Sequence, residues 1–210
     1  MRKSVYIIGA RGFGRECANN LQMDQRFREN YELKGFLDDK ADALNGFDNY
    51  PPIVSSVEDF IPRENDVFVC GLGKNEYRKK YIEIMLSKKA YFQTFIHPTA
   101  IIHPTAVLGV GVLVGAMTTV SADVKVGDFT LIHPYNCLGH DTVLERFCVS
   151  ESFSFFGGFS FVGEGATIHT RATILPHIKV GRGAVVGAGS VVLRSVSEGT
   201  TVFGNPAIRF

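Results

Sequence analysis

Apolar residues follow two different patterns along this chain of 210 residues, and the pattern changes near residue 93. In the first part, short apolar runs at 4–8, 33–37 and 67–70 alternate with segments of helical composition at about 14–23 and 75–87. Strands that alternate with helices are typical of a parallel sheet with helices packed beside it. The pattern therefore predicts a small α/β domain over residues 1–92.

From Ile96 onward, apolar residues recur at every sixth position. Sixteen of the seventeen positions from Ile96 to Val192 are apolar, and Ser150 is the exception. The residue four places further on is nearly always small, as at Ala100, and glycine often follows the apolar residue directly. A period of six fits one short strand and one corner, so three repeats predict an 18-residue coil of a parallel β-helix over residues 93–210. Aromatic residues replace the aliphatic ones in Ser150–Phe161, where we expect a coil that is locally irregular or faces an interface.

Composition and charge exclude several classes of protein. The 22 Lys and Arg residues nearly balance the 21 Asp and Glu residues, so a net charge of +1 offers no basic surface for nucleic acid. The apolar run at 5–10 is too short for a membrane span or for the core of a signal peptide. Cys17, Cys70, Cys137 and Cys148 show no CxxC motif and no disulfide-framework spacing. They are predicted to be reduced, buried thiols in a cytoplasmic protein.

A glycine-rich turn, GARGFG, follows the first predicted strand and opens the first helix. Gly9, Gly12 and Gly14 allow the backbone to approach a phosphate, and the helix N-terminus adds a favourable partial charge. The match to the GxGxxG pattern is imperfect, and about 90 residues are too few for a complete dinucleotide-binding domain. We therefore expect a small Rossmann-like domain, with a tight turn that binds no ligand as the alternative.

Polar residues also follow the other two predicted strands. Asp38 and Asp39 end the second strand, where acidic side chains bind ribose hydroxyls or simply cap a solvated turn. Gly71 ends the third strand, and Asn75 and Arg78 follow in the next helix. Arg78 either faces a phosphate or belongs to a basic helix surface. Three strand ends that converge on one crevice are typical of a ligand site in an open α/β sheet.

Taken together, the segments GARGFGRE, GFLDD, GLGKNEYRKK and FIHPTA, the pair His140–Asp141 and the terminal GNPA resemble one family over nearly the whole chain. This family is the bacterial hexapeptide-repeat sugar acetyltransferases, which includes sialic acid O-acetyltransferases and nucleotide-sugar N-acetyltransferases. The resemblance implies a left-handed β-helix that binds acetyl-CoA between the subunits of a homotrimer. It also implies that the first domain holds a nucleotide sugar, whose amine or hydroxyl accepts the acetyl group in glycan biosynthesis.

The family's general base is a histidine followed by an acidic residue, which maps onto His140 with Asp141 as its orienting carboxylate. Imidazole has a pKa near neutral pH, so it suits removal of a proton from an amine or hydroxyl that attacks a thioester. Gly158 comes 18 residues after His140, which places the two on adjacent coils about 4.8 Å apart. The resemblance gives the Gly158 N–H the role of oxyanion donor. A surface histidine and a turn glycine are the structural alternatives.

The resemblance also implies the remaining contacts. The expected nucleotide-sugar set adds Phe13 and His133 to the glycines and polar residues above. The expected acetyl-CoA set comprises Gly158, Thr170, Gly187, Ala188, Gly189, Asn205 and Pro206, of which 187–189 are small enough to admit a ligand or are ordinary corners. The chain departs from the family pattern at Phe13 and Val149, where the family often has histidine, and at His133, where it can carry asparagine.

Two other enzyme classes fit the sequence less well. His97, His133 and His169 recur at intervals of 36 residues, so neighbours lie about 9.6 Å apart. That distance is too long to share a zinc ion, whose ligands lie near 2 Å, and we expect no metal. The first domain is too short for a nicotinamide oxidoreductase. A non-catalytic nucleotide-sugar-binding or scaffold protein is the alternative, against which His140 and the GNPA end argue.

Overall fold

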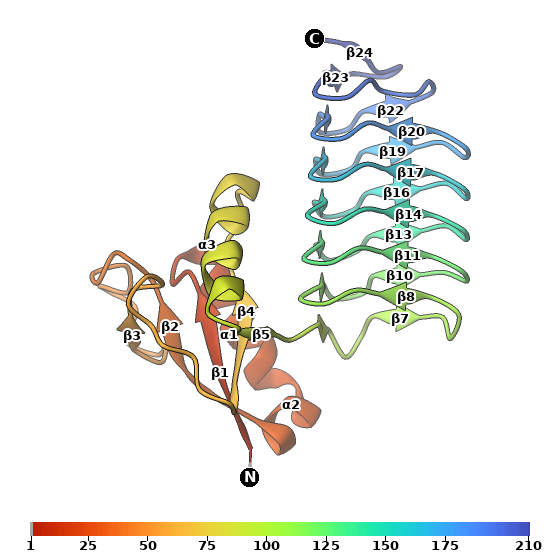
Figure 1. The fold of residues 1–210 in the computed structure, drawn as a ribbon. Helices are drawn as coiled ribbons and strands as arrows, with labels where there is room; N and C mark the ends of the chain where they lie inside the picture. Colours follow the sequence, from red (N-terminus) through yellow and green to blue (C-terminus); the bar gives the residue numbers. More distant parts are fainter. Residues whose placement is uncertain (1) are drawn as a thin grey trace. The chain divides into compact units, whose positions relative to one another are not determined.

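The computed structural model describes residues 2–210, which divide into two compact units at Gln93 and Thr94. The first unit is a parallel sheet with helices, and the second is a stack of coils (Figure 1). The elements of the first unit are β1 (Lys3–Ile8), α1 (Gly12–Met23), α2 (Gln25–Asn30), β2 (Tyr31–Leu37), β3 (Ile53–Ser55), β4 (Asp66–Cys70), α3 (Asn75–Ser87) and β5 (Tyr91–Phe92). The Rossmann-like architecture predicted for this part of the chain is confirmed.

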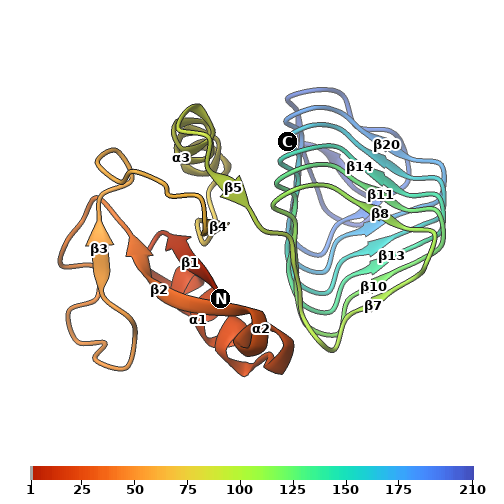
Figure 2. The same ribbon diagram turned by 60° about the horizontal axis from the view of Figure 1, so that its bottom comes forward.

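The five strands of the first unit lie in the order β3-β2-β1-β4-β5, and all of them are parallel. The central strand β1 is apolar because both faces are covered, and Val5, Ile7 and Ile8 have no exposed surface. The right-handed crossover rule places α1 and α2 on one face of the sheet and α3 on the other, as Figure 2 shows. The chain leaves β1 and β4 toward opposite faces, which opens a crevice at the carboxyl ends of these two neighbouring strands.

The helices and short strands of this unit differ in detail from the prediction. The short elements α2, β3 and β5 were not predicted, because two to six residues carry too little periodicity. In α3 the buried residues are Arg78, Ile82 and Met85, so Arg78 does not belong to a basic helix surface, which was one alternative for it. No helix over residues 2–210 has the length and apolar composition that crossing a membrane requires.

The second unit is the left-handed parallel β-helix that was predicted, built from three sheets of two-residue strands. In Figure 2 the coils show a three-sided outline. Strands pair with a register of 18 residues, so that Leu138 lies between Val120 and Phe156. The first sheet contains β7 (Ile101–Ile102), β10 (Thr119–Val120), β13 (Cys137–Leu138), β16 (Phe155–Phe156), β19 (Thr173–Ile174) and β22 (Val191–Val192).

The other two sheets follow the same pattern. The second contains β8 (Val107–Leu108), β11 (Lys125–Val126), β14 (Val143–Leu144), β17 (Phe161–Val162) and β20 (Lys179–Val180). The third contains β6 (Phe95–Ile96), β9 (Leu113–Val114), β12 (Leu131–Ile132), β15 (Val149–Ser150), β18 (Thr167–Ile168), β21 (Val185–Val186), β23 (Thr201–Phe203) and β24 (Ile208–Arg209). All of these strands pair in parallel except β24, which is antiparallel to β23.

Each six-residue repeat sends two side chains into the interior. The sixth-position residue is large and aliphatic, and the residue four places on is small, as at Ile168 and Ala172. Ser150 breaks the aliphatic row because a buried polar side chain lies beside it: its hydroxyl donates to Asn136 Oδ1 over 2.7 Å. Asn136 Nδ2 in turn donates to the carbonyl oxygens of His133 and Glu151. The exception in the periodic pattern is thus a satisfied polar core site.

Two expectations for this half are corrected. Of the two alternatives for the aromatic segment, the locally irregular coil is wrong, because Phe156 fills the large interior position with no exposed surface and Ser154 and Ser160 fill the small one. A position at an interface stays a prediction. The remaining phenyl rings of the segment stand on the outside or at corners without disturbing the strand pairing. Cys137 is only half-buried, because it occupies the outward position of β13, whereas the other three cysteines are buried as predicted.

Candidate functional site

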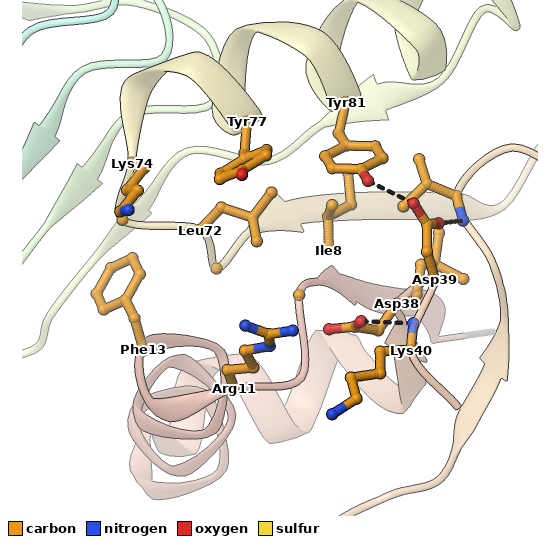
Figure 3. A pocket seen from close by; sticks show the side chains of 15 residues that line it. Ile8, Arg11, Phe13, Asp38, Asp39, Lys40, Leu72, Lys74, Tyr77 and Tyr81 are labelled. Atoms are coloured by element: carbon orange, nitrogen blue, oxygen red, sulfur yellow. Dashed lines mark hydrogen bonds between the residues drawn. The ribbon is translucent and has the colours of Figure 1, made fainter. Parts of the chain in front are cut away.

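A cavity of about 610 Å³ lies at the carboxyl ends of β1, β2 and β4 (Figure 3). It is lined by the turn after β1, by the residues that follow β2, by the turn after β4 and by one face of α3. The crevice predicted from the three strand ends therefore exists. Its lining includes the predicted residues Gly9, Phe13, Asp38, Asp39 and Gly71.

The glycines after β1 and β4 allow three backbone segments to pack together. Gly9 has φ +93°, a left-handed conformation that favours glycine. A Cβ added to Gly14 would lie 1.8 Å from the carbonyl oxygen of Gly9, and one added to Gly71 would lie 2.6 Å from the Cα of Gly14. Gly12, by contrast, opens α1 with no atom within 4 Å of an added Cβ. Gly9, Gly14 and Gly71 are thus required by the contact between β1, α1 and β4.

The two carboxylates after β2 shape the cavity wall. Asp38 accepts hydrogen bonds from the backbone N–H groups of Ala10 over 2.8 Å and Lys40 over 2.9 Å, which ties the β1 turn to the β2 turn. Asp39 accepts from the N–H of Val57 over 3.2 Å and from the hydroxyl of Tyr81. The hydrogen bond to Asp39, with some burial, raises the pKa of Tyr81 to about 12, so the phenol stays neutral at physiological pH.

Sequence reasoning missed several residues of the cavity. Figure 3 shows Arg11, Lys40 and Lys74 around it, together with the phenol rings of Tyr77 and Tyr81 on α3. The signal was present, since Tyr77 and Tyr81 are four residues apart on a helix that begins at the end of β4. Of the residues predicted in this unit, four do not line the cavity: Gly12, Gly14, Asn75 and Arg78. Arg78 is fully buried and its guanidinium donates to Asn75 over 3.1 Å, so Arg78 packs inside the domain.

A second candidate site lies on a corner of the β-helix, just after β13. His140 Nδ1 and Asp141 Oδ2 are 2.9 Å apart, and the imidazole is 61% exposed. Asp141 takes a left-handed backbone conformation, φ +59°, as do the corner residues Phe159 and His177 on the next two coils. With Nδ1 facing a carboxylate, the neutral imidazole carries its proton there, and Nε2 is left as a proton acceptor.

Gly158 lies directly against the imidazole, as the 18-residue spacing predicts. A Cβ added to Gly158 would lie 2.7 Å from Cε1 and 2.8 Å from Nε2 of His140. The carbonyl of Gly158 accepts from the N–H of His177 over 3.1 Å. Its own N–H donates to no acceptor within residues 2–210. The structure thus brings together His140, Asp141 and Gly158.

Another corner of the β-helix carries a histidine–carboxylate pair that sequence reasoning missed. His169 Nδ1 lies 3.1 Å from Glu151 Oε2, and the same oxygen accepts from the N–H of Thr170 over 3.1 Å. The 18-residue spacing of Glu151 and His169 was the available signal. Thr170 therefore lies beside the Glu151–His169 pair. That corner precedes β19, whereas His140 lies at the corner that follows β13.

The remaining predicted residues are distributed over the β-helix. Gly187 is covered by Phe203, whose ring would be 2.3 Å from an added Cβ, whereas Gly189 has open space around it. Ala188 is exposed. Asn205 and Pro206 are joined by a cis peptide bond in the turn between β23 and β24. His133 precedes β13, and its N–H donates to the carbonyl of Ser150 over 2.8 Å. Within residues 2–210, no group of three or more His, Cys, Asp or Glu side chains is arranged to hold a metal ion.

Comparison with protein families gives two matches. Residues 4–85 match the family described as PglD N-terminal domain, and residues 159–194 match the family described as bacterial transferase hexapeptide (six repeats). A comparison with curated proteins found no match.

Comparison with solved structures gives matches over the whole chain. The acetyltransferase domain of PglB from Neisseria gonorrhoeae FA1090 is 26% identical, with a TM-score of 0.89 and 100% of both chains covered. A mutant of perosamine N-acetyltransferase from Caulobacter crescentus, in complex with CoA and GDP-perosamine, is 25% identical, with a TM-score of 0.87 and 99% of this chain and 96% of the other covered. WeeI from Acinetobacter baumannii AYE is 26% identical, with a TM-score of 0.78 and coverage of 98% and 99%.

Proposed function

We propose that this chain, which belongs to the bacterial hexapeptide-repeat sugar acetyltransferases, moves an acetyl group from acetyl-CoA to an amine or hydroxyl of a nucleotide-linked sugar, with His140 as general base. The perosamine N-acetyltransferase that resembles it was solved with CoA and GDP-perosamine, which supports both substrate classes. The observation that carries the catalytic proposal is the His140–Asp141 pair, packed on the backbone of Gly158.

The proposed mechanism uses three groups of this corner. Nε2 of His140 takes the proton from the acceptor N–H or O–H while that nitrogen or oxygen bonds to the thioester carbonyl carbon. The N–H of Gly158 donates to the oxygen of that carbonyl as negative charge develops on it. The carbon–sulfur bond then breaks, and the imidazolium returns the proton to the thiolate sulfur. Asp141 holds the tautomer and stabilises the imidazolium.

We assign the cavity of the first unit to the nucleotide sugar. Arg11, Lys40 and Lys74 surround it with positive charge, which suits the diphosphate of a nucleotide sugar. The backbone N–H groups that open α1 add to this field. The exposed phenol ring of Tyr77 offers a flat surface against which a nucleobase can stack. Thr170, Gly189, Asn205 and Pro206 remain proposed contacts of acetyl-CoA.

The direct test is CoA thiol release from acetyl-CoA in the presence of a panel of nucleotide-linked amino and deoxy sugars. We expect release with at least one acceptor, and mass spectrometry of the product should show a gain of one acetyl group. A nucleotide sugar that binds tightly, with no thiol release from any acceptor, would instead support a non-catalytic binding protein. The mass of a nucleotide sugar that co-purifies with the protein would identify the acceptor.

We also propose a homotrimer located in the cytoplasm. Phe153, Phe155 and Phe159 are 53%, 43% and 51% exposed on one stretch of the β-helix, and such a cluster is costly to leave in water. Cyclic symmetry would bury the same patch on every copy. The cytoplasm is the compartment predicted from the cysteine spacing. Light scattering at micromolar concentration should give three times the mass of the chain, and a monomer would contradict the proposal.

A further inference from the structure

The imidazole of His140 belongs to a row of three rings. The proposed mechanism uses His140 and assigns no role to the other two. Phe159 lies edge-to-face with His140, with ring centroids 5.2 Å apart and planes at 87°. On its other side Phe159 stacks on His177, with centroids 5.0 Å apart and planes at 5°. The rings come from three successive coils, those of β13, β16 and β19.

The backbone holds Phe159 firmly relative to both neighbours. Its N–H donates to the carbonyl of His140 over 3.0 Å, and the N–H of His177 donates to the carbonyl of Gly158 over 3.1 Å. The phenyl ring is nevertheless half-exposed, so the β-helix interior does not immobilise it. The contacts with the two imidazoles are therefore what defines its orientation.

His140 needs such a contact because its other restraints do not fix the plane of the imidazole ring. The hydrogen bond to Asp141 fixes Nδ1, but a single hydrogen bond does not fix the plane of a ring that is 61% exposed. Gly158 supports the ring from one direction, where an added Cβ would collide with it. Phe159, the next residue on the same coil, adds an edge-to-face contact with the imidazole, which restrains the plane of that ring.

We propose that Phe159, backed by His177, is a positioning residue that keeps Nε2 of His140 aligned for proton transfer. The inference rests on the proposed role of His140 as general base. Loss of an aromatic contact of this kind corresponds to a change in kcat of up to about tenfold through the geometry of the base.

The test is steady-state kinetics of Phe159→Ala beside a matched control. We expect kcat to fall about tenfold in Phe159→Ala, with the KM of both substrates within about twofold of wild type. Phe159→Tyr should restore kcat, and Phe159→Leu, which keeps bulk but no ring, should not. Tyr135→Ala is the control, because Tyr135 has the same exposure and corner conformation as Phe159 but stacks on Phe153 instead of contacting His140. Wild-type kcat in Phe159→Ala, or an equal loss in Tyr135→Ala, would overturn the proposal.

A double variant separates this inference from the proposed function. In a His140→Ala background, Phe159→Ala should cost no further activity, because there is no imidazole left to position. An undiminished tenfold loss in that background would show that Phe159 acts independently. Full activity in His140→Ala alone would refute the proposed function, whereas loss in His140→Ala with none in Phe159→Ala would refute only this inference.

Discussion

The candidate sites of the two units use their aspartates in opposite ways. In the first unit, Asp38 and Asp39 bind backbone N–H groups and the Tyr81 hydroxyl, and these bonds set the shape of a cavity. In the second unit, Asp141 binds the exposed imidazole of His140 on a corner whose shape is already set by strand pairing. Polar groups thus shape the cavity in one unit, whereas in the other the repeat builds the scaffold and leaves the polar pair exposed. Changes in the first unit should therefore alter stability and affinity, and changes in the second should alter rate.

The largest effect is expected for His140→Ala. Loss of the general base should reduce kcat by about 10²- to 10⁴-fold with little change in KM, because the group acts in the transition state. Asp141→Asn should cost less, since it weakens the orientation of the imidazole and removes no proton acceptor. Steady-state rates with the true acceptor from pH 6 to 9 provide the measurement. Unchanged rates over that range would make His140 a surface residue and remove the contrast between the two units.

Gly158→Ala should rank second. The new Cβ would collide with the imidazole, and a displacement of about 1 Å can cost about 10²-fold in rate. The colliding atoms belong to an exposed side chain that can turn away, so the thermal unfolding midpoint should hardly change. Circular dichroism melts alongside kcat give the comparison. A lower melting temperature with proportionate loss of active protein would mean that Gly158 is needed only for folding.

A matched pair of glycine substitutions probes the first unit. Gly14→Ala places a Cβ against the backbone of Gly9, which cannot move aside, and such overpacking costs about 1–3 kcal/mol. Gly12→Ala adds a Cβ in open space at the start of α1 and should stabilise by about 0.5–1 kcal/mol. Urea denaturation measures both changes. Equal stabilities would show that the close contact of β1 and α1 relaxes at no cost.

The smallest effect is expected for Tyr81→Phe, which removes the hydrogen bond to Asp39. The loss should be about 1 kcal/mol of stability and a few-fold rise in the KM of the nucleotide sugar, with kcat unchanged. The pKa of Tyr81 is raised to about 12 in the folded protein from 10 in the unfolded chain. Its contribution is therefore complete below pH 10 and is lost as pH rises through 12. The difference in unfolding free energy between wild type and Tyr81→Phe should be smaller at pH 11.5 than at pH 9. A larger difference at pH 11.5 would contradict this assignment.

The periodic half of the chain could be predicted almost completely from the sequence. Every sixth residue points inward, so the apolar repeat determined the strands, the coil length and the stacking of Gly158 on His140. A locally irregular coil in the aromatic segment was one expectation, and it is wrong because Phe156 keeps the interior position of the repeat beside small Ser154 and Ser160. The first unit was harder, since α2, β3 and β5 are held by tertiary contacts and not by local pattern.

The candidate sites divide in the same manner. His140 and Asp141 were identified from the family resemblance, and the 18-residue repeat then placed Gly158 beside His140, because a repeat converts sequence spacing into distance. The lining of the cavity was only partly identifiable, because it depends on which face α3 turns to the sheet. A charged residue was expected at the surface, but Arg78 is buried and Tyr77 and Tyr81 face the cavity. An amphipathic pattern assigns charged residues to the exposed face of a helix, so it identifies the wrong face when an arginine is buried.

The reversed direction of β24 has a consequence for polymerisation. A stack of parallel coils ends in open strand edges, onto which another molecule could add coils without limit. Strand β24 reverses direction and covers the outer edge of β23, and it is only two residues long, so this edge offers an incoming coil few backbone donors and acceptors. The reversal thus disfavours edge-to-edge association at this sheet.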